Sequence, residues 1–93
     1  MIQSFDSKET ETNWRGIRSV KLPDPIQEIA RRKLRMLNNS VDLKDLSILP
    51  SNRLEKLKGE KKGFYSIRIN DQWRITFKWI DGHLYNVEIV DYH

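Results

Sequence analysis

The fold is decided by residues 64–90, which read FYSIRINDQWRITFKWIDGHLYNVEIV. Apolar and polar side chains alternate along this stretch, as they do in strands that bury one face of a sheet. The apolar face of three predicted strands carries Tyr65, Ile67 and Ile69, then Trp73, Ile75, Phe77 and Trp79, then Tyr85, Val87 and Ile89. Short turns at Asp71-Gln72 and Asp81-Gly82 predict an antiparallel meander, because Asp-Gly strongly favours tight hairpin turns.

The clearest helix start in the chain lies at Asp24-Pro25. Asp24 is expected to cap the helix, Pro25 suits its first turn, and Gln27 occupies the position of a capping-box partner. Apolar side chains then recur at helical spacing, so we expect the helix to end near Asn38.

Shorter elements surround this helix. We expect an edge strand at Ile2–Phe5, a short helix at Ser7–Trp14, a mobile loop at Arg15–Pro23 and a helical turn within 41–46. Helices in the first half and strands in the second predict an α+β fold, with N-terminal helices packed on an antiparallel β-sheet. The length of 93 residues allows one domain, spanning 1–93.

The composition narrows the possible functions. Seventeen Lys and Arg against thirteen Asp and Glu give a formal net charge of +4, which favours a phosphate-bearing partner but is a weak signal alone. The absence of Cys excludes a disulfide scaffold, a thiolate nucleophile and a Cys-ligated zinc site. With two His and no Cys, nothing has metal-site spacing, and no glycine-rich phosphate loop is present. We therefore expect neither a metal nor a cofactor.

The start of the chain lacks the basic and apolar segments of a signal peptide. No apolar stretch approaches the ~20 residues that a membrane span needs. These two patterns predict a soluble, cytoplasmic protein without membrane contact.

Cations gather on the polar side of the predicted sheet. Arg68 and Arg74 flank one turn, and Lys78 lies further along the second strand. Arginine forks match phosphate geometry, so these residues are candidates for phosphate or RNA binding. The alternative is a solvated strand face whose charges prevent aggregation at the sheet edge.

The chain ends in Asp91-Tyr92-His93, three side chains that can accept, donate or orient a proton. They could lie over the cationic face if the last strand carries them there. The alternative is a frayed and inert terminus. Glu55 and Lys58, just before the turn at Gly59, form a pair of opposite charges that is most often a surface pair.

Several segments resemble a known family. They are NRLEKLKG at 52–59, SIRINDQWRITF at 66–77 and VEIVDYH at 87–93, with the opening MIQSF at 1–5. Together they resemble the HigB family of host-inhibition toxins in the RelE superfamily, most closely its GraT-like subset. The resemblance spans nearly the whole chain, and the combination of an N-x-x-W-R strand with a terminal D-Y-H is fairly specific.

This resemblance implies an activity and partners. The family implies a ribosome-dependent mRNA endonuclease that inhibits translation, acting on message in the A site of the small (30S) ribosomal subunit. Its members are held inactive by a HigA-like helix-turn-helix antitoxin, and the complex binds operator DNA only through the antitoxin. The implied reaction needs no metal, because a ribose 2′-hydroxyl attacks its own 3′ phosphate.

Site residues follow from the same resemblance. Arg74 matches the arginine that stabilises phosphate, and Lys58 matches a lysine beside the active site. The residues Asp91, Tyr92 and His93 match the terminal catalytic group.

Glu55 departs from the better-known members, which carry histidine at this position, although GraT-like chains also carry glutamate. Our hypothesis is that His93 and Glu55 share proton transfer while Arg74 and Arg68 stabilise charge.

The sequence leaves two other functions open. A basic nucleic-acid-binding module without catalysis would stack bases on exposed aromatic rings, but Trp73, Phe77 and Trp79 alternate away from the arginines. A ParE-like inhibitor of DNA gyrase shares the fold and has no need of the terminal Asp-Tyr-His. Cuts in translated message would distinguish the nuclease from both.

Overall fold

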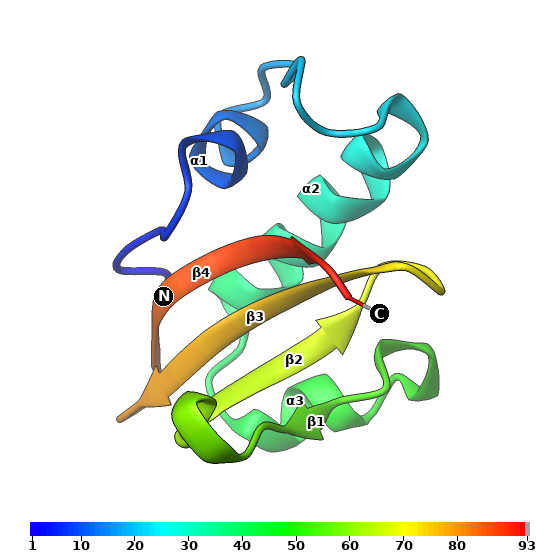
Figure 1. The fold of residues 1–93 in the computed structure, drawn as a ribbon. Helices are drawn as coiled ribbons and strands as arrows, with labels where there is room; N and C mark the ends of the chain where they lie inside the picture. The colour runs from blue at the N-terminus through cyan, green and yellow to red at the C-terminus, as the bar shows by residue number, and fades with distance from the viewer. Residues whose placement is uncertain (93) are drawn as a thin grey trace.

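Residues 64–91 form the three long strands of an antiparallel sheet in the computed structural model, which describes residues 1–92 (Figure 1). These strands are β2 (Phe64–Arg68), β3 (Trp73–Ile80) and β4 (His83–Asp91). Each strand pairs with the next one along the chain, so the predicted meander is confirmed.

A fourth strand, β1 (Glu55–Lys56), pairs with β2 at the edge of the sheet, and the order is β1-β2-β3-β4. This strand is not among those predicted from the sequence. Both residues of β1 are exposed, so this short strand has no apolar alternation to mark it in the sequence. It matters for the site because it places Glu55 opposite Ser66.

The predicted helices are present. Helix α2 (Asp24–Asn39) crosses one face of the sheet, and α1 (Lys8–Trp14) packs beside it (Figure 1). A short helix, α3 (Leu43–Ser47), and two 3-10 turns, η1 (Pro50–Asn52) and η2 (Gly59–Lys61), follow. Within residues 1–92, no helix is both long and apolar enough to cross a bilayer.

The start of α2 differs from the predicted cap. Pro23 is the N-cap, and its carbonyl accepts a hydrogen bond from Ile26 N at 3.2 Å. Asp24 is already helical, and its carboxylate accepts hydrogen bonds from Arg18 at 2.8 and 3.0 Å, which lower the pKa of Asp24. The predicted Asp24 cap is therefore wrong, because this carboxylate binds a loop side chain rather than the helix backbone.

Gln27 likewise takes no part in a capping box. Its side chain accepts a hydrogen bond from Ser19 N at 2.9 Å and donates to the carbonyls of Ser19 at 2.7 Å and Leu22 at 2.9 Å. These bonds fasten segment 15–23 to α2, and Ser19 and Leu22 are buried. The segment has no regular structure, as predicted, but a buried glutamine holds it in place.

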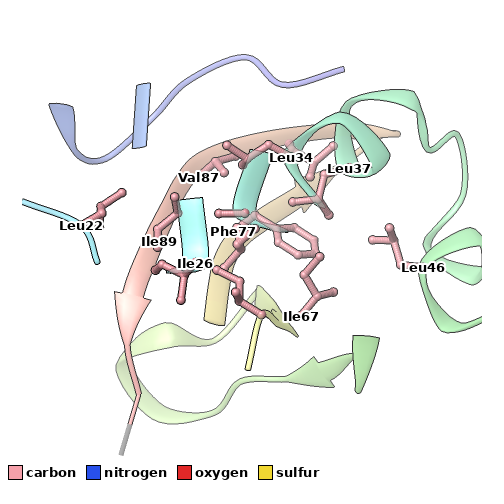
Figure 2. Close-up of a cluster of buried hydrophobic side chains, with 13 residues drawn as sticks. Leu22, Ile26, Leu34, Leu37, Leu46, Ile67, Phe77, Val87 and Ile89 are labelled. Atoms are coloured by element: carbon pink, nitrogen blue, oxygen red, sulfur yellow. The ribbon is translucent and has the colours of Figure 1, made fainter. Parts of the chain in front are cut away.

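The core lies between α2 and the sheet. Phe77 of β3 is fully buried, and its ring lies close to Leu34 of α2 and Ile67 of β2 (Figure 2). Trp73 and Trp79 are partly buried and pack against the same cluster. The aromatic side chains of β3 therefore belong to the core, as the alternation predicts, and not to a base-stacking platform.

A β-bulge in β4 interrupts the predicted alternation. Thr76 lies opposite Glu88, whereas Lys78 lies opposite Tyr85, so β4 has one extra residue between these pairs. Within this stretch Asn86 has a left-handed backbone, with φ of 56°. The extra residue shifts the alternation of β4 by one position.

The shift changes which side chains reach the core. Leu84 is fully buried before the bulge, and Val87 is fully buried after it, while Tyr85 stays partly exposed. The prediction that Tyr85 and Val87 share the apolar face is therefore wrong.

The N-terminal segment lies beside the bulge. Isolated parallel bridges join residues 2–5 to β4, so the predicted edge strand exists only as single bridges. Ser4 Oγ accepts a hydrogen bond from Asn86 N at 2.8 Å, and Asp6 accepts one from Asn86 Nδ2 at 2.7 Å. These contacts cover the outer edge of β4 at the bulge.

The left-handed backbone of Asn86 gives a prediction about stability. We expect Asn86→Val to be less stable than Asn86→Gly by about 1–2 kcal/mol, because a β-branched residue resists this backbone conformation. Both variants lose the hydrogen bond to Asp6, so the loss of this bond does not contribute to the difference between them. Equal free energies of unfolding in urea would contradict the left-handed assignment.

Candidate active site

The sheet face turned away from the core carries polar and charged side chains. Ladder pairing places Arg68 opposite Arg74 and Ser66 opposite Thr76. Glu55 of β1 lies opposite Ser66 on its other side. Residues opposite each other in an antiparallel ladder share a face, so three strands contribute to one surface. Arg68 and Arg74 lie together on it, as the strand pattern predicts.

Arg74 is a buried charge on this face, with 6% of its surface exposed. Its Nε donates to Ser66 Oγ at 2.8 Å. Its Nη2 donates to the Arg53 carbonyl at 2.5 Å and to the Ser66 carbonyl at 3.3 Å. The alternative of a solvated strand face is therefore wrong for Arg74, because three acceptors fix the orientation of its guanidinium.

Two reactive side chains lie next to this guanidinium. Arg74 Nη1 is 3.8 Å from Glu55 Oε1, an ion-pair distance longer than a direct hydrogen bond. Arg74 Cζ lies 5.6 Å from the centre of the Tyr92 ring, within the range of a cation–π contact. The side chain of Glu55 is 50% exposed and Tyr92 is 40% exposed. A ligand that approaches Arg74 can therefore reach a carboxylate and a phenol.

The end of β4 is held in the sheet. Asp91 lies opposite Trp73, and Tyr92 N donates to the Gln72 carbonyl at 2.6 Å. Gln72 Nε2 also donates to Asp91 Oδ2 at 3.1 Å. The alternative of a frayed terminus is therefore wrong as far as Tyr92, and the predicted site residue His93 lies outside the described residues.

Arg68 has a partner of its own. Its Nη2 donates to Asp71 Oδ1 at 2.5 Å, and this hydrogen bond, with the nearby charges of Arg68 and Arg53, lowers the pKa of the Asp71 carboxyl. The Asp71 side chain is almost fully exposed. Arg68 thus lies beside Arg74, but its guanidinium is paired with a carboxylate at the tip of the turn.

The two predicted lysines lie further from Arg74. Lys78 is on the same strand and opposite Phe64, and four residues of extended strand separate it from Arg74 by roughly 13 Å. Lys58 is exposed and directly precedes η2, after the end of β1. The structure therefore brings together Arg74, Glu55, Tyr92 and Arg68. It leaves the two lysines at the margin, and it pairs Asp91 with Trp73, on the other face of the ladder from Arg74.

Two groups that bond Arg74 were not predicted, the Ser66 hydroxyl and the Arg53 carbonyl. The Gln72 side chain, which bonds Asp91, was not predicted either. Ser66 shares a strand face with Arg68, which is a signal that the sequence pattern contains. The Arg53 carbonyl has no such signal, because a backbone acceptor depends on chain direction and not on residue type.

The chemistry available at the site follows from these groups. Within residues 1–92, no cluster of three or more His, Cys, Asp or Glu side chains could hold a metal ion. A fixed guanidinium can stabilise developing negative charge, and a neighbouring carboxylate can accept a proton. This combination suits attack on a phosphate ester.

Known proteins resemble this chain over most of its length. Residues 4–93 match a family described as the RelE-like toxin of the type II toxin–antitoxin system HigB. Toxin HigB-1 of Vibrio cholerae serotype O1 is 44% identical over 61 residues, which cover 66% of this chain and 64% of that toxin. Endoribonuclease HigB of Proteus vulgaris is 30% identical over 95 residues, which cover 100% of both chains.

A solved structure shares the fold. A mutant of YafQ from E. coli aligns with a TM-score of 0.68 and 14% identity, and the alignment covers 98% of this chain and 91% of that chain. At this identity the likeness concerns the fold alone. It confirms the predicted small α+β fold.

The bond between Ser66 and Arg74 gives a second prediction. We expect Ser66→Ala to lower the free energy of unfolding by about 1.5–3 kcal/mol, because it removes a buried acceptor from a charged donor. Ser40→Ala is a matched control, since buried Ser40 donates only to a neutral carbonyl, that of Leu37, at 2.7 Å. A loss no larger than that of the control, measured by urea unfolding, would contradict the role of Ser66.

Proposed function

This chain belongs to the HigB-like family of RelE-like toxins of type II toxin–antitoxin systems, and from that premise we propose that it is an endoribonuclease. Its substrate is messenger RNA held in the A site of the small ribosomal subunit. Cutting this message stops translation and arrests growth. The relationship to the Proteus vulgaris endoribonuclease supports the activity, and the resemblance described above supports the dependence on the ribosome.

The observation that carries the proposal is the held guanidinium of Arg74. Ser66 and Arg53 take hydrogen bonds from Nε and Nη2, while Nη1 points toward Glu55. Nη1 and the Glu55 carboxylate form an ion pair at 3.8 Å. A phosphate oxygen can take the place of this carboxylate beside Nη1. A cation that is already oriented needs no rearrangement when negative charge develops beside it.

The proposed reaction is a transfer of the phosphoryl group within the RNA chain. The ribose 2′-oxygen forms a bond to the adjacent phosphorus, and the bond from phosphorus to the 5′ oxygen breaks. The products are a 2′,3′-cyclic phosphate and a 5′-hydroxyl. The reaction needs a base for the 2′ proton, an acid for the leaving oxygen and a cation for the phosphorane.

Each requirement has a candidate. Glu55 accepts the 2′ proton, since it is accessible and next to Arg74, and Arg74 stabilises the phosphorane. His93 protonates the leaving oxygen; this role comes from the family resemblance. Tyr92 packs against the guanidinium, and Asp91 orients the end of the chain.

The remaining cations hold the neighbouring phosphates of the message. Arg68 can exchange the exposed Asp71 carboxylate for a phosphate, because an exposed ion pair is weak. Lys58 and Lys78 would contact phosphates of the message further from the cleaved bond.

The protein partners follow from the family. An antitoxin protein binds the toxin and keeps it inactive, and we propose a HigA-like helix-turn-helix protein in this role. Operator DNA is then bound through the antitoxin alone.

The role of Arg74 gives a prediction about activity. We expect both Arg74→Ala and Arg74→Lys to cleave ribosome-bound message about 10²–10³-fold more slowly than the wild type. Lysine keeps the charge but lacks the fork that Ser66 and the Arg53 carbonyl orient. The measurement is the cleavage rate in a translation system of purified components, with naked RNA as the control for dependence on the ribosome. Full activity of Arg74→Lys would contradict this prediction, because it would show that a positive charge at position 74 is enough for cleavage without the guanidinium fork.

Glu55 gives a separate prediction. We expect Glu55→Gln to lower the cleavage rate by about 10²–10⁴-fold, because glutamine cannot accept the 2′ proton. Glu55→His should retain activity, since histidine can act as a base and stands at this position in the better-known members of the family. Equal rates for the glutamine variant and the wild type would remove Glu55 from the mechanism.

A further inference from the structure

Asn52 is fully buried beside the site, although the proposed reaction does not use it. It is the last residue of η1. Its Nδ2 donates to the Leu46 carbonyl at 2.9 Å and to Met36 Sδ at 3.2 Å, and its Oδ1 accepts a hydrogen bond from Lys33 Nζ. One side chain therefore fastens η1 to both α2 and α3.

The next residue is Arg53, whose carbonyl accepts the hydrogen bond from Arg74 Nη2 at 2.5 Å. Arg53 has a left-handed backbone with φ of 43°, which is uncommon outside glycine. Its N–H donates to the Pro50 carbonyl at 3.1 Å, so the turn closes on itself. The direction of the Arg53 carbonyl depends on where η1 is held, and the Asn52 side chain ties η1 to α2 and α3.

Lys33 strengthens this attachment. Burial lowers the pKa of the Lys33 ammonium, and the nearby charges of Arg32 and Arg68 lower it further. A partly desolvated cation gains from a fixed neutral acceptor. The Lys33–Asn52 bond is therefore a favourable link between α2 and η1, whatever Arg74 does.

We propose that Asn52 is a positioning residue, which sets the orientation of the Arg74 guanidinium by holding the Arg53 carbonyl in place. The expected effect on cleavage rests on the proposed function, whereas the effect on the guanidinium does not. A fully buried side chain cannot touch the message, so Asn52 acts only through Arg53.

The competing explanation is that Asn52 stabilises the fold and nothing more. Asn13 offers a matched control, because it is also fully buried and its Nδ2 donates to the Gln27 carbonyl at 2.9 Å. Asn13 joins α1 to α2, and among the described residues it makes no hydrogen bond to η1 or Arg74. Asn13→Ala should lower the free energy of unfolding without moving the Arg74 guanidinium.

The experiment compares the full chain carrying Asn52→Ala, Lys33→Met or Asn13→Ala with the wild type. The first readout is the NMR signals of the Arg74 Nη protons, which report how freely the guanidinium rotates. We expect faster rotation in Asn52→Ala and Lys33→Met, and wild-type behaviour in Asn13→Ala. Lys33→Met covers the case in which Asn52→Ala does not fold, and Lys33→Arg should restore the slow rotation.

The second readout is cleavage of ribosome-bound message under steady-state, multiple-turnover conditions. We expect kcat to fall by about tenfold to a hundredfold in Asn52→Ala, with KM nearly unchanged. A misdirected Arg74 guanidinium stabilises the transition state less, while the binding of message is unaffected. Nη signals and kcat that match those of Asn13→Ala would overturn the proposal. A wild-type chain that leaves message intact would refute the proposed function, and the Nη signals would still decide the role of Asn52.

Discussion

A charged guanidinium buried on the outer face of the sheet is the constraint on which the rest of the structure depends. Removing such a charge from water costs several kcal/mol unless its donors find partners. Here the partners are the Ser66 hydroxyl and carbonyl and the Arg53 carbonyl, with Glu55 at ion-pair distance. A buried serine, a left-handed residue and a two-residue strand all gather around Arg74. The same contacts that stabilise the charge also orient it for a ligand.

The geometry of β4 brings the end of the chain to this cation. The turn at Asp81-Gly82 has positive φ at both residues, which suits a tight hairpin. The bulge at Asn86 shifts the alternation in the middle of the strand, so apolar side chains face the core on both sides of it. Pairing with β3 then continues to Asp91, and Tyr92 lies against the guanidinium. A strand that ended earlier would leave the site without its phenol.

Much of the fold could be predicted, because α2 and the long strands have strong periodicity. The bulge, β1 and the true cap of α2 could not, since they depend on tertiary contacts. Asn86 bonds to the N-terminal segment, Glu55 pairs with a distant strand, and Asp24 binds Arg18. For the site, strand pattern and family resemblance together indicated Arg74 and Tyr92. The role of the Arg53 carbonyl could not be predicted from the sequence, because every residue has a backbone carbonyl that can accept a hydrogen bond.

The function proposed for this chain is cleavage of translated message at the site built around the held Arg74 guanidinium and the Tyr92 ring that packs against it. The most direct test is the integrity of message after brief induction in cells, mapped by primer extension for the wild type and for the double variant Arg74→Ala with Tyr92→Ala. We expect cuts inside translated frames with the wild type and none with the double variant. Intact message together with arrested growth under the wild type would contradict the claim, and would favour a toxin that acts by binding alone.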